Sequence, residues 1–344
     1  MKTVSLDVHS DASQLYAVND QGEVILEMRV PTEAGVLRQI IGGIPGRKRV
    51  VFEEGPLSGL LRDALSEVAE EVVSCDPTHN ALIARNENSN DRDDAIGLST
   101  LARMGELRPV YVPPEPYRTL RGLLMHDWHL HQDIVRAKCR IKALCRQHGI
   151  RYGRENIYAP ARRDGVLAQL DRPARVWQMR SLYRQLDLGI RERGAGRRTV
   201  SRLVREMPEV KRLQGAPGVG PQTARTLVAW IVDPGRFKSR NALAAYCGLG
   251  LGRGWTNWKP VGRTRASKRG QRQLKRLLFI AAKAASHGSS ALARRYHARQ
   301  ASGWDHSKAI RDVARTLLRV VCVMWTKHTE YCDDRVSVPQ RTGA

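Results

Sequence analysis

The sequence predicts an α/β domain over residues 1–110 and a mostly helical remainder, on three observations. Short apolar runs of period two alternate with helical runs in the first part, whereas long helical runs dominate the second. Residues 1–110 hold 11 Lys and Arg against 18 Asp and Glu, while residues 111–344 hold 47 against 16. A Pro-rich segment, residues 107–117, separates the two parts, so we predict a domain boundary there.

The elements of the first part follow from its hydrophobic periodicity. Three alternating segments joined by short turns predict an antiparallel meander, and two more segments of strand length are separated by helical ones. The expected strands cover residues 3–8, 14–18, 23–30, 49–53 and 71–76, and the expected helices cover 33–44, 57–65 and 92–105. This β-β-β-α-β-α-β-α order is the pattern of an RNase H-like fold, a mixed sheet with helices on its faces.

The second part is expected to be helical and basic. Its expected elements are helices over residues 123–145, 162–206, 241–249, 267–280 and 307–327, with a loop or hairpin over 250–265. The first two helices predict either a helical arm, such as an antiparallel coiled coil, or a plain helical domain with a basic solvated face. We therefore divide this part into an arm (111–206), a C-terminal domain (207–330) and a disordered tail (331–344).

An acidic motif opens the helix expected at residues 92–105. Asp91 and Asp94 are three residues apart and share a helical face, while Asp93 points elsewhere. Carboxylates this close repel one another unless a cation lies between them, and Mg²⁺ or Mn²⁺ takes such oxygen ligands. The same acids also fit an ordinary helix start, because they complement the helix dipole without a metal. Acids from elsewhere in the chain are needed to favour the metal site.

Asp7 and Glu53 supply those acids in the predicted topology. Asp7 lies on the first, central strand and Glu53 ends the strand beside it, so both side chains reach a common point. Together with Asp91 and Asp94 they predict a four-carboxylate site for two divalent ions about 4 Å apart. Glu54 leaves a one-residue ambiguity, and Glu53 is favoured because it directly follows the apolar strand residues.

Two segments of the C-terminal part indicate nucleic-acid binding. The run Leu213–Ala224 has the signature of a helix-hairpin-helix, whose glycines let the turn approach a phosphate. A Gly-rich turn used only for packing is the alternative. The second segment opens a basic helix whose first turn suits a phosphate. The residues expected to contact nucleic acid are Gly218, Val219, Gly220, Thr223, Ser267, Lys268, Arg269 and Arg272.

Composition narrows the class of partner and the compartment. The chain carries a formal net charge of +24, which indicates a polyanionic partner. Six cysteines without a CxxC pair or zinc spacing fit reduced thiols. No signal-peptide pattern follows Met1, and Arg315 and Arg319 interrupt the most apolar C-terminal run, so no membrane span is expected. These features predict a cytoplasmic nucleic-acid-binding protein.

Five motifs occur together in a specific order. They are Asp7 on the first strand, Val51-Phe52-Glu53 before a Gly turn, Asp91-x-x-Asp94-Ala95, Pro217-Gly218-Val219-Gly220 with Thr223-Ala224, and Ala244-Ala245-Tyr246-Cys247-Gly248-Leu249 before Ser267-Lys268-Arg269-Gly270. In this order the chain resembles transposases of the insertion-sequence 110 family, D-E-D-D recombinases that include DNA invertases. The resemblance covers roughly residues 3–325. It implies an RNase H-like domain, a coiled-coil dimerisation arm, a transposase domain with a nucleophilic serine, and a structured guide RNA.

The resemblance also implies roles for individual residues. The metal positions of the family are matched by Asp7, Glu53, Asp91 and Asp94. The place of the family's nucleophilic serine is taken by Thr256, whose hydroxyl is more hindered. Ser267 is the nearest serine, but it matches a separate, phosphate-binding part of the family pattern.

The predicted function is a Mg²⁺- or Mn²⁺-dependent DNA transposase that acts on double-stranded DNA with a guide RNA, as a homodimer or homotetramer. Carboxylates hold metal at the scissile phosphate, a loop hydroxyl attacks, and a 3′-OH leaves. Two other functions fit the same residues. One is a junction-resolving, structure-selective nuclease that uses water as its nucleophile, and the other is a non-catalytic nucleic-acid-binding derivative of a transposase.

Overall fold

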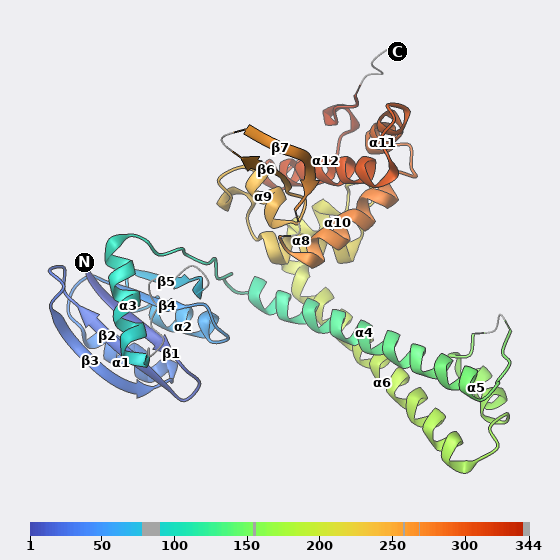
Figure 1. The fold of residues 1–344 in the computed structure, drawn as a ribbon, viewed down its shortest axis with the longest axis horizontal. Coiled ribbons are helices and arrows are strands. Elements are labelled where there is room, and N and C mark those ends of the chain that lie inside the picture. The colour runs from blue at the N-terminus through green and yellow to red at the C-terminus, as the bar shows by residue number, and fades with distance from the viewer. Residues whose placement is uncertain (78–89, 154–155, 257–258, 268, 340–344) are drawn as a thin grey trace. The chain divides into compact units, whose positions relative to one another are not determined.

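The computed structural model describes residues 1–77, 90–153, 156–256, 259–267 and 269–339, with the backbone alone over 253–266. The chain divides into two compact units, Met1–Pro114 and Glu115–Ala344. The division falls within the Pro-rich segment identified in the sequence. A mixed sheet with helices forms the first unit and helices dominate the second, as predicted (Figure 1).

The N-terminal unit is built on a five-stranded sheet in the order β3-β2-β1-β4-β5. Its strands are β1 (Lys2–Val8), β2 (Ala12–Val18), β3 (Val24–Pro31), β4 (Lys48–Glu53) and β5 (Glu71–Cys75). The pairs β1–β2 and β2–β3 are antiparallel, as in the predicted meander, whereas β4 is parallel to both β1 and β5. The central strand β1 and its neighbour β4 therefore end at the same edge of the sheet.

Helices cover both faces of this sheet. Helices α1 (Ala34–Gly43) and α2 (Ser58–Leu65) bury Leu37 and Leu61 against one face. Helix α3 (Asp91–Met104) buries Leu98 against the other face, where it meets Val51 of β4. Burial of these apolar side chains joins the three layers, and each large aliphatic side chain contributes roughly 1.5–3 kcal/mol.

The alternation of side chains along β1 and β4 determines which of them face α3. Leu6 and Phe52 are paired neighbours in the core beneath α1 and α2. The next residues, Asp7 and Glu53, therefore project to the opposite face. Ser5 agrees with this assignment, because its hydroxyl donates to a backbone carbonyl of α3 over 2.6 Å. Both predicted acids of the sheet lie on the face that α3 covers.

A helical hairpin opens the C-terminal unit. Helices α4 (Tyr117–Gln147) and α6 (Pro173–Leu203) run in opposite directions side by side, and α5 (Pro160–Leu167) lies near the hairpin's far end (Figure 1). The helix predicted over 162–206 is interrupted, because Pro173 has no N–H to continue a helix and instead occupies the first turn of α6. Asp127 of α4 is 6% exposed and accepts hydrogen bonds from Arg193 and Arg197 of α6.

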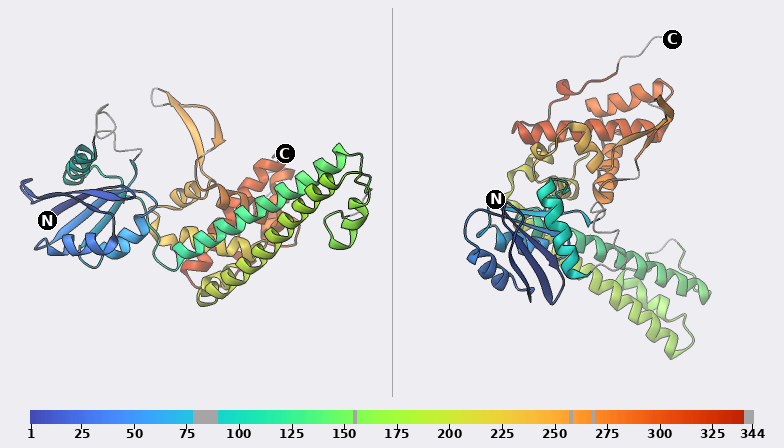
Figure 2. Two further views of the ribbon diagram at one scale, coloured as in Figure 1. Left: turned by 90° about the horizontal axis from the view of Figure 1, so that it is seen from below. Right: turned by 60° about the vertical axis from the view of Figure 1, so that its left-hand side comes forward.

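The remaining helices pack around one apolar core, to which α8, α10 and α12 contribute buried aliphatic side chains. The elements are α7 (Pro208–Leu213), α8 (Pro221–Ile231), α9 (Arg240–Tyr246), α10 (Arg272–Ala285), α11 (Ala291–Ala301) and α12 (His306–Thr326). Strands β6 (Leu251–Thr256) and β7 (Lys259–Ala266) form an antiparallel hairpin that projects from these helices (Figure 2). The segment predicted as a loop or hairpin is thus a hairpin.

The tail differs from the predicted disordered segment over 331–344. A short 3₁₀ helix, η4 (Asp333–Arg335), is followed by Val336, which is 6% exposed. Asp333 accepts the backbone N–H of Ala291 over 2.9 Å, and Arg295 donates to the carbonyl of Ser337. These contacts hold the segment against α11, whereas residues 340–344 lie outside the described residues.

Within the part of the chain that the structure describes, no helix has both the length and the apolar character that crossing a membrane requires.

Candidate functional site

Polar side chains from β1 and the first turn of α3 converge at one end of the sheet. His9 Nε2 lies 2.9 Å from Asp7 Oδ2 and 3.4 Å from Asp91 Oδ1. The potential ligand atoms of all three residues lie within 4.8 Å of one another. Asp94 is close enough that its charge acts on Asp7. Two of the four predicted metal-site acids, Asp7 and Asp91, therefore meet here, with Asp94 nearby on the same turn of α3. We call Asp7, Asp91 and Asp94, together with His9, the acidic cluster.

The start of α3 explains why its acids reach β1. The side chain of Asn90 accepts the backbone N–H of Asp93 over 3.0 Å, so the helix begins at Asp91. Asp91 and Asp94, three residues apart on this first turn, then lie on the side of β1. Between them, Arg92 is drawn away by an ion pair with Glu27 of β3.

The electrostatics of the acidic cluster fit a bound cation. Burial raises the pKa of Asp7, the charges of Asp94 and Asp91 raise it further, and His9 opposes them. The Asp7 side chain is 17% exposed, whereas that of Asp91 is 48% exposed, so the cluster opens to solvent on one side. Carboxylate oxygens with a single imidazole are a donor set that Mg²⁺ or Mn²⁺ accepts, and such an ion would offset the repulsion among the acids.

A pocket of about 480 Å³ adjoins the acidic cluster. Its walls include Asp7 and His9, and also Glu53 and Glu54 at the end of β4. The Glu54 backbone N–H donates to the carbonyl of Cys75 over 2.8 Å, and its side chain is exposed. Both candidate glutamates thus lie beside Asp7, and the alternation along β4 favours Glu53 as the acid on the face of α3.

His9 is the polar residue of this site that the sequence reasoning missed. It follows Asp7 by two positions at the end of β1, and residues with that spacing share a face of a strand. An Asp-x-His sequence at the end of a central strand was the available signal. His9 stands between Asp7 and Asp91, where it partly neutralises them when protonated or offers a nitrogen ligand when neutral.

Thr256, the predicted nucleophile, is the last residue of β6 and pairs with Lys259 of β7. The structure describes its backbone alone. The role of the Thr256 hydroxyl therefore stays a prediction.

The turn between α7 and α8 contains one glycine that packs closely against another helix and one glycine with open space beside it. Gly218 has φ +77°, and a Cβ there would lie 2.1 Å from the carbonyl oxygen of Ala281 in α10. A Cβ on Gly220 would meet nothing within 4 Å. Val219 and Thr223 are buried. Of the four residues predicted to contact nucleic acid in this turn, Gly220 is the one with open space beside its Cα.

The basic segment before α10 is organised by a glycine. Gly270 has φ +103°, a conformation that favours glycine, and the helix begins two residues later, at Arg272 rather than at Ser267. The Ser267 hydroxyl accepts the backbone N–H of Arg269 over 3.1 Å. The side chains of Arg269 and Arg272 are exposed, as phosphate contacts require, and Lys268 lies outside the described residues.

Comparisons with known proteins match both units. A family model described as "Transposase", whose name specifies the DEDD transposases of IS110, matches residues 4–150, which include all four predicted metal-site acids. A second model, described as "Transposase IS116/IS110/IS902 family", matches residues 210–298. An "Insertion element IS110 uncharacterized 43.6 kDa protein" of Streptomyces coelicolor is 32% identical over 119 residues. That alignment covers 35% of this chain and 29% of the relative, so the chain matches under a third of the relative's length.

The two family models match separate segments that together make up more than half of the chain. The acidic cluster lies in the first matched segment, and the turn between α7 and α8 lies in the second. The chain therefore belongs to the IS110 family of transposases.

Proposed function

We propose that this protein is a divalent-metal-dependent DNA transposase that cleaves and rejoins DNA strands. The observation that carries the proposal is the acidic cluster, which brings Asp7 together with Asp91 and Asp94 inside the segment that matches DEDD transposases. The strand order β3-β2-β1-β4-β5 with helices on both faces supports an RNase H-like fold for this unit. The proposed metal ligands are Asp7, Glu53, Asp91 and Asp94.

The proposed reaction is a transesterification. The acids Asp7, Glu53, Asp91 and Asp94 would hold a divalent cation, which would supply charge stabilisation at the scissile phosphate. The Thr256 hydroxyl attacks the phosphorus, and a threonine–phosphate ester forms as the bond to the 3′ oxygen breaks. A general base takes the hydroxyl proton and the leaving 3′ oxygen gains one. Attack of another strand's 3′-OH on this ester reverses the step and releases the threonine.

The C-terminal unit is proposed to hold DNA and a structured guide RNA. The open space at Gly220 and the exposed Arg269 and Arg272 support phosphate contacts by a helix-hairpin-helix and by the start of α10. We propose that the α4–α6 hairpin is a coiled-coil arm joining two copies. Its exposed Trp177 and Leu188, 65% and 50% exposed, support this assignment, because apolar side chains at such exposure favour association.

Alanine at the acidic cluster tests the proposal. Asp7→Ala and Asp94→Ala are expected to reduce Mn²⁺-dependent strand cleavage of DNA carrying the element's ends by about a thousand-fold or more. Binding of DNA or RNA should change by less than about threefold, because phosphate contacts lie elsewhere. Asp93→Asn is the matched control and should cleave as the wild type does. Full recombination by Asp7→Ala would overturn the site.

A structure-selective nuclease is the second candidate function. The observation that favours it is the threonine at position 256, which is a more hindered nucleophile than serine. Water would then attack the phosphate, and the DNA products would carry no protein. Cleavage of branched DNA without a guide RNA distinguishes this activity from transposition.

A further inference from the structure

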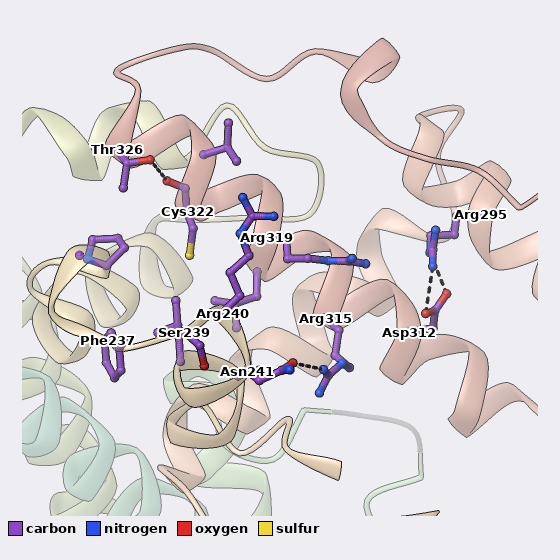
Figure 3. Close-up of a pocket in the computed structure, with 16 residues that line it drawn as sticks. Phe237, Ser239, Arg240, Asn241, Arg295, Asp312, Arg315, Arg319, Cys322 and Thr326 are labelled. Atoms are coloured by element: carbon purple, nitrogen blue, oxygen red, sulfur yellow. Dashed lines mark hydrogen bonds and ion pairs between the residues drawn. The ribbon is translucent and has the colours of Figure 1, made fainter.

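A second large pocket lies in the C-terminal unit, among α9, α12 and the short turn before α9. Figure 3 shows the residues that line this pocket. Its volume is about 900 Å³. Four arginines line it: Arg240 from α9, Arg315 and Arg319 from α12, and Arg295 from α11. A smaller hollow of about 330 Å³ shares three of them, Arg240, Arg295 and Arg319. The two hollows therefore meet at the arginines and form one groove, which we call the arginine groove.

Three of these arginines lack a carboxylate partner among the described residues. Arg315 donates to the carbonyl of Leu249 and to the side chain of Asn241, and Arg319 donates to the hydroxyl of Thr316 over 2.9 Å. Arg240 is exposed and has neither an ion pair nor a side-chain hydrogen bond within the described part of the chain. Neutral oxygens thus satisfy part of the hydrogen-bonding capacity of Arg315 and Arg319, and they neutralise the charge of none of the three arginines.

Two acids line the groove, Asp312 and the exposed Glu330, against five arginines once Arg335 of the smaller hollow is counted. Asp312 is already engaged. Asp312 accepts hydrogen bonds from Arg295 over 2.7 and 3.0 Å and from Arg299 over 3.0 Å. Although burial opposes it, these bonds hold the pKa of Asp312 below its ordinary value. Partial burial and the charges of Arg295, Arg315 and Arg240 lower the pKa of Arg319. The arginine groove therefore carries net positive charge under mutual repulsion, which an anion would relieve.

We propose that the arginine groove binds a phosphodiester of a nucleic-acid strand. Arg240 and Arg319 hold the phosphate where the two hollows meet, and the strand continues on both sides. Guanidinium groups bind phosphate oxygens through paired N–H donors, and these two have donors to spare. The half-buried apolar side chain of Phe237 in the larger hollow offers contact for a base or sugar.

Nucleic acid fits this groove better than a small anion for two reasons. The pocket of about 900 Å³ exceeds the space that a single phosphate group occupies. Its cations also come from separate helices, a spread that suits a chain of repeating charges. The inference rests on the proposed function only for the choice of nucleic acid as the polyanion. It adds a contact surface whose lining does not include Gly220, Arg269 or Arg272.

The salt dependence of binding tests the inference. Affinities of the full chain for a single-stranded DNA, a duplex DNA and a single-stranded RNA are measured over a range of salt, without metal. Arg240→Gln should weaken binding by roughly threefold to tenfold. It should also make the negative slope of log affinity against log salt less steep by about one. The double variant R240Q/R319Q should make this slope less steep by about two. The ligand whose slope falls identifies the strand that the groove holds.

A matched control separates the arginine groove from overall charge. The variant R38Q/R47Q removes the same charge from the N-terminal unit, where Arg38 and Arg47 pair with Glu67 and Glu70. It should keep the wild-type slope. Equal slopes for R240Q/R319Q and the control, with all three ligands, would overturn the inference. Arg240→Gln should fold normally, because the Arg240 side chain is exposed and has no ion pair or hydrogen bond with the residues that the structure describes. Failure of metal-dependent cleavage would contradict the proposed function alone.

Discussion

Asp7 and Glu53 reach one face of the sheet because β1 and β4 are parallel neighbours with Leu6 opposite Phe52. The residue after each apolar partner then points away from the core. This is why the sequence predicts both acids from strand periodicity alone. It cannot predict that His9 stands between Asp7 and Asp91, because the ring's position depends on how α3 is placed against β1.

The choice between the two glutamates is testable at the residue scale. Glu53→Gln is expected to lower metal-dependent cleavage by at least about a hundred-fold, because it removes a charged ligand from the face of α3. Glu54→Gln should lower cleavage by less than about threefold. The measurement is initial cleavage rate at saturating Mn²⁺, and a larger loss for Glu54→Gln would place Glu54 at the metal.

The nucleophile is tested at position 256. Thr256→Ala should abolish a protein–DNA adduct that survives denaturation, whereas Thr256→Ser should keep or increase it, because serine is less hindered. Adducts are detected by gel electrophoresis after brief reaction with labelled DNA. An adduct of undiminished yield with Thr256→Ala would exclude this hydroxyl, and cleavage without any adduct in the wild type would favour the nuclease.

At the scale of elements, the sequence predicts the bounds of some helices closely and misses other features. Helices α1, α3 and α12 begin and end within about two residues of the predicted bounds, because periodicity and caps act locally. The break before α6 and the contacts of the tail through Val336 were not predicted. The tail's order depends on α11, and such long-range contacts leave no local pattern in the sequence.

Substitution of two glycines tests whether the turn between α7 and α8 contacts DNA or serves packing only. Gly218→Ala should destabilise the fold by at least about 2 kcal/mol, because it combines positive φ with a clash against Ala281. Gly220→Ala should fold normally and lower DNA affinity on the order of tenfold, because a methyl group would fill the proposed phosphate approach. Thermal unfolding and DNA binding are measured for both. Unchanged binding by a folded Gly220→Ala would favour a turn that serves packing only.

The α4–α6 hairpin depends on a buried charge. Asp127→Asn should lower the free energy of unfolding by about 3 kcal/mol, because Arg193 and Arg197 lose their shared carboxylate. The matched control is Asp133→Asn on the same helix, whose exposed ion pair with Arg136 should matter by less than about 0.5 kcal/mol. Chemical denaturation compares the two. Equal effects would show that Asp127 does not join the helices.

At the scale of the whole molecule, the acidic and basic parts of the chain coincide with the two compact units. The acidic unit carries the proposed metal centre, and the basic unit carries the turn at Gly220 and the arginine groove. The charge composition indicated this division, because net charge is summed over many residues and does not depend on the role of any single residue.

Guide RNA binding is a prediction about the assembly. The protein expressed with its flanking DNA should co-purify with one discrete RNA transcribed from beside its gene, because a basic surface with defined shape selects a folded strand. Sequencing of the bound RNA identifies it. Recovery of only heterogeneous cellular RNA, with no enrichment over an unrelated basic protein, would contradict the prediction.

The central claim is that the acids of β1, β4 and α3 form one divalent-metal centre. Isothermal titration of Mn²⁺ into the full chain tests it most directly, with Asp7→Ala and Asp93→Asn titrated in parallel. The account predicts saturable binding to the wild type and to Asp93→Asn, and loss of that binding in Asp7→Ala. Binding that is equally strong in Asp7→Ala, or undetectable in the folded wild type, would contradict it.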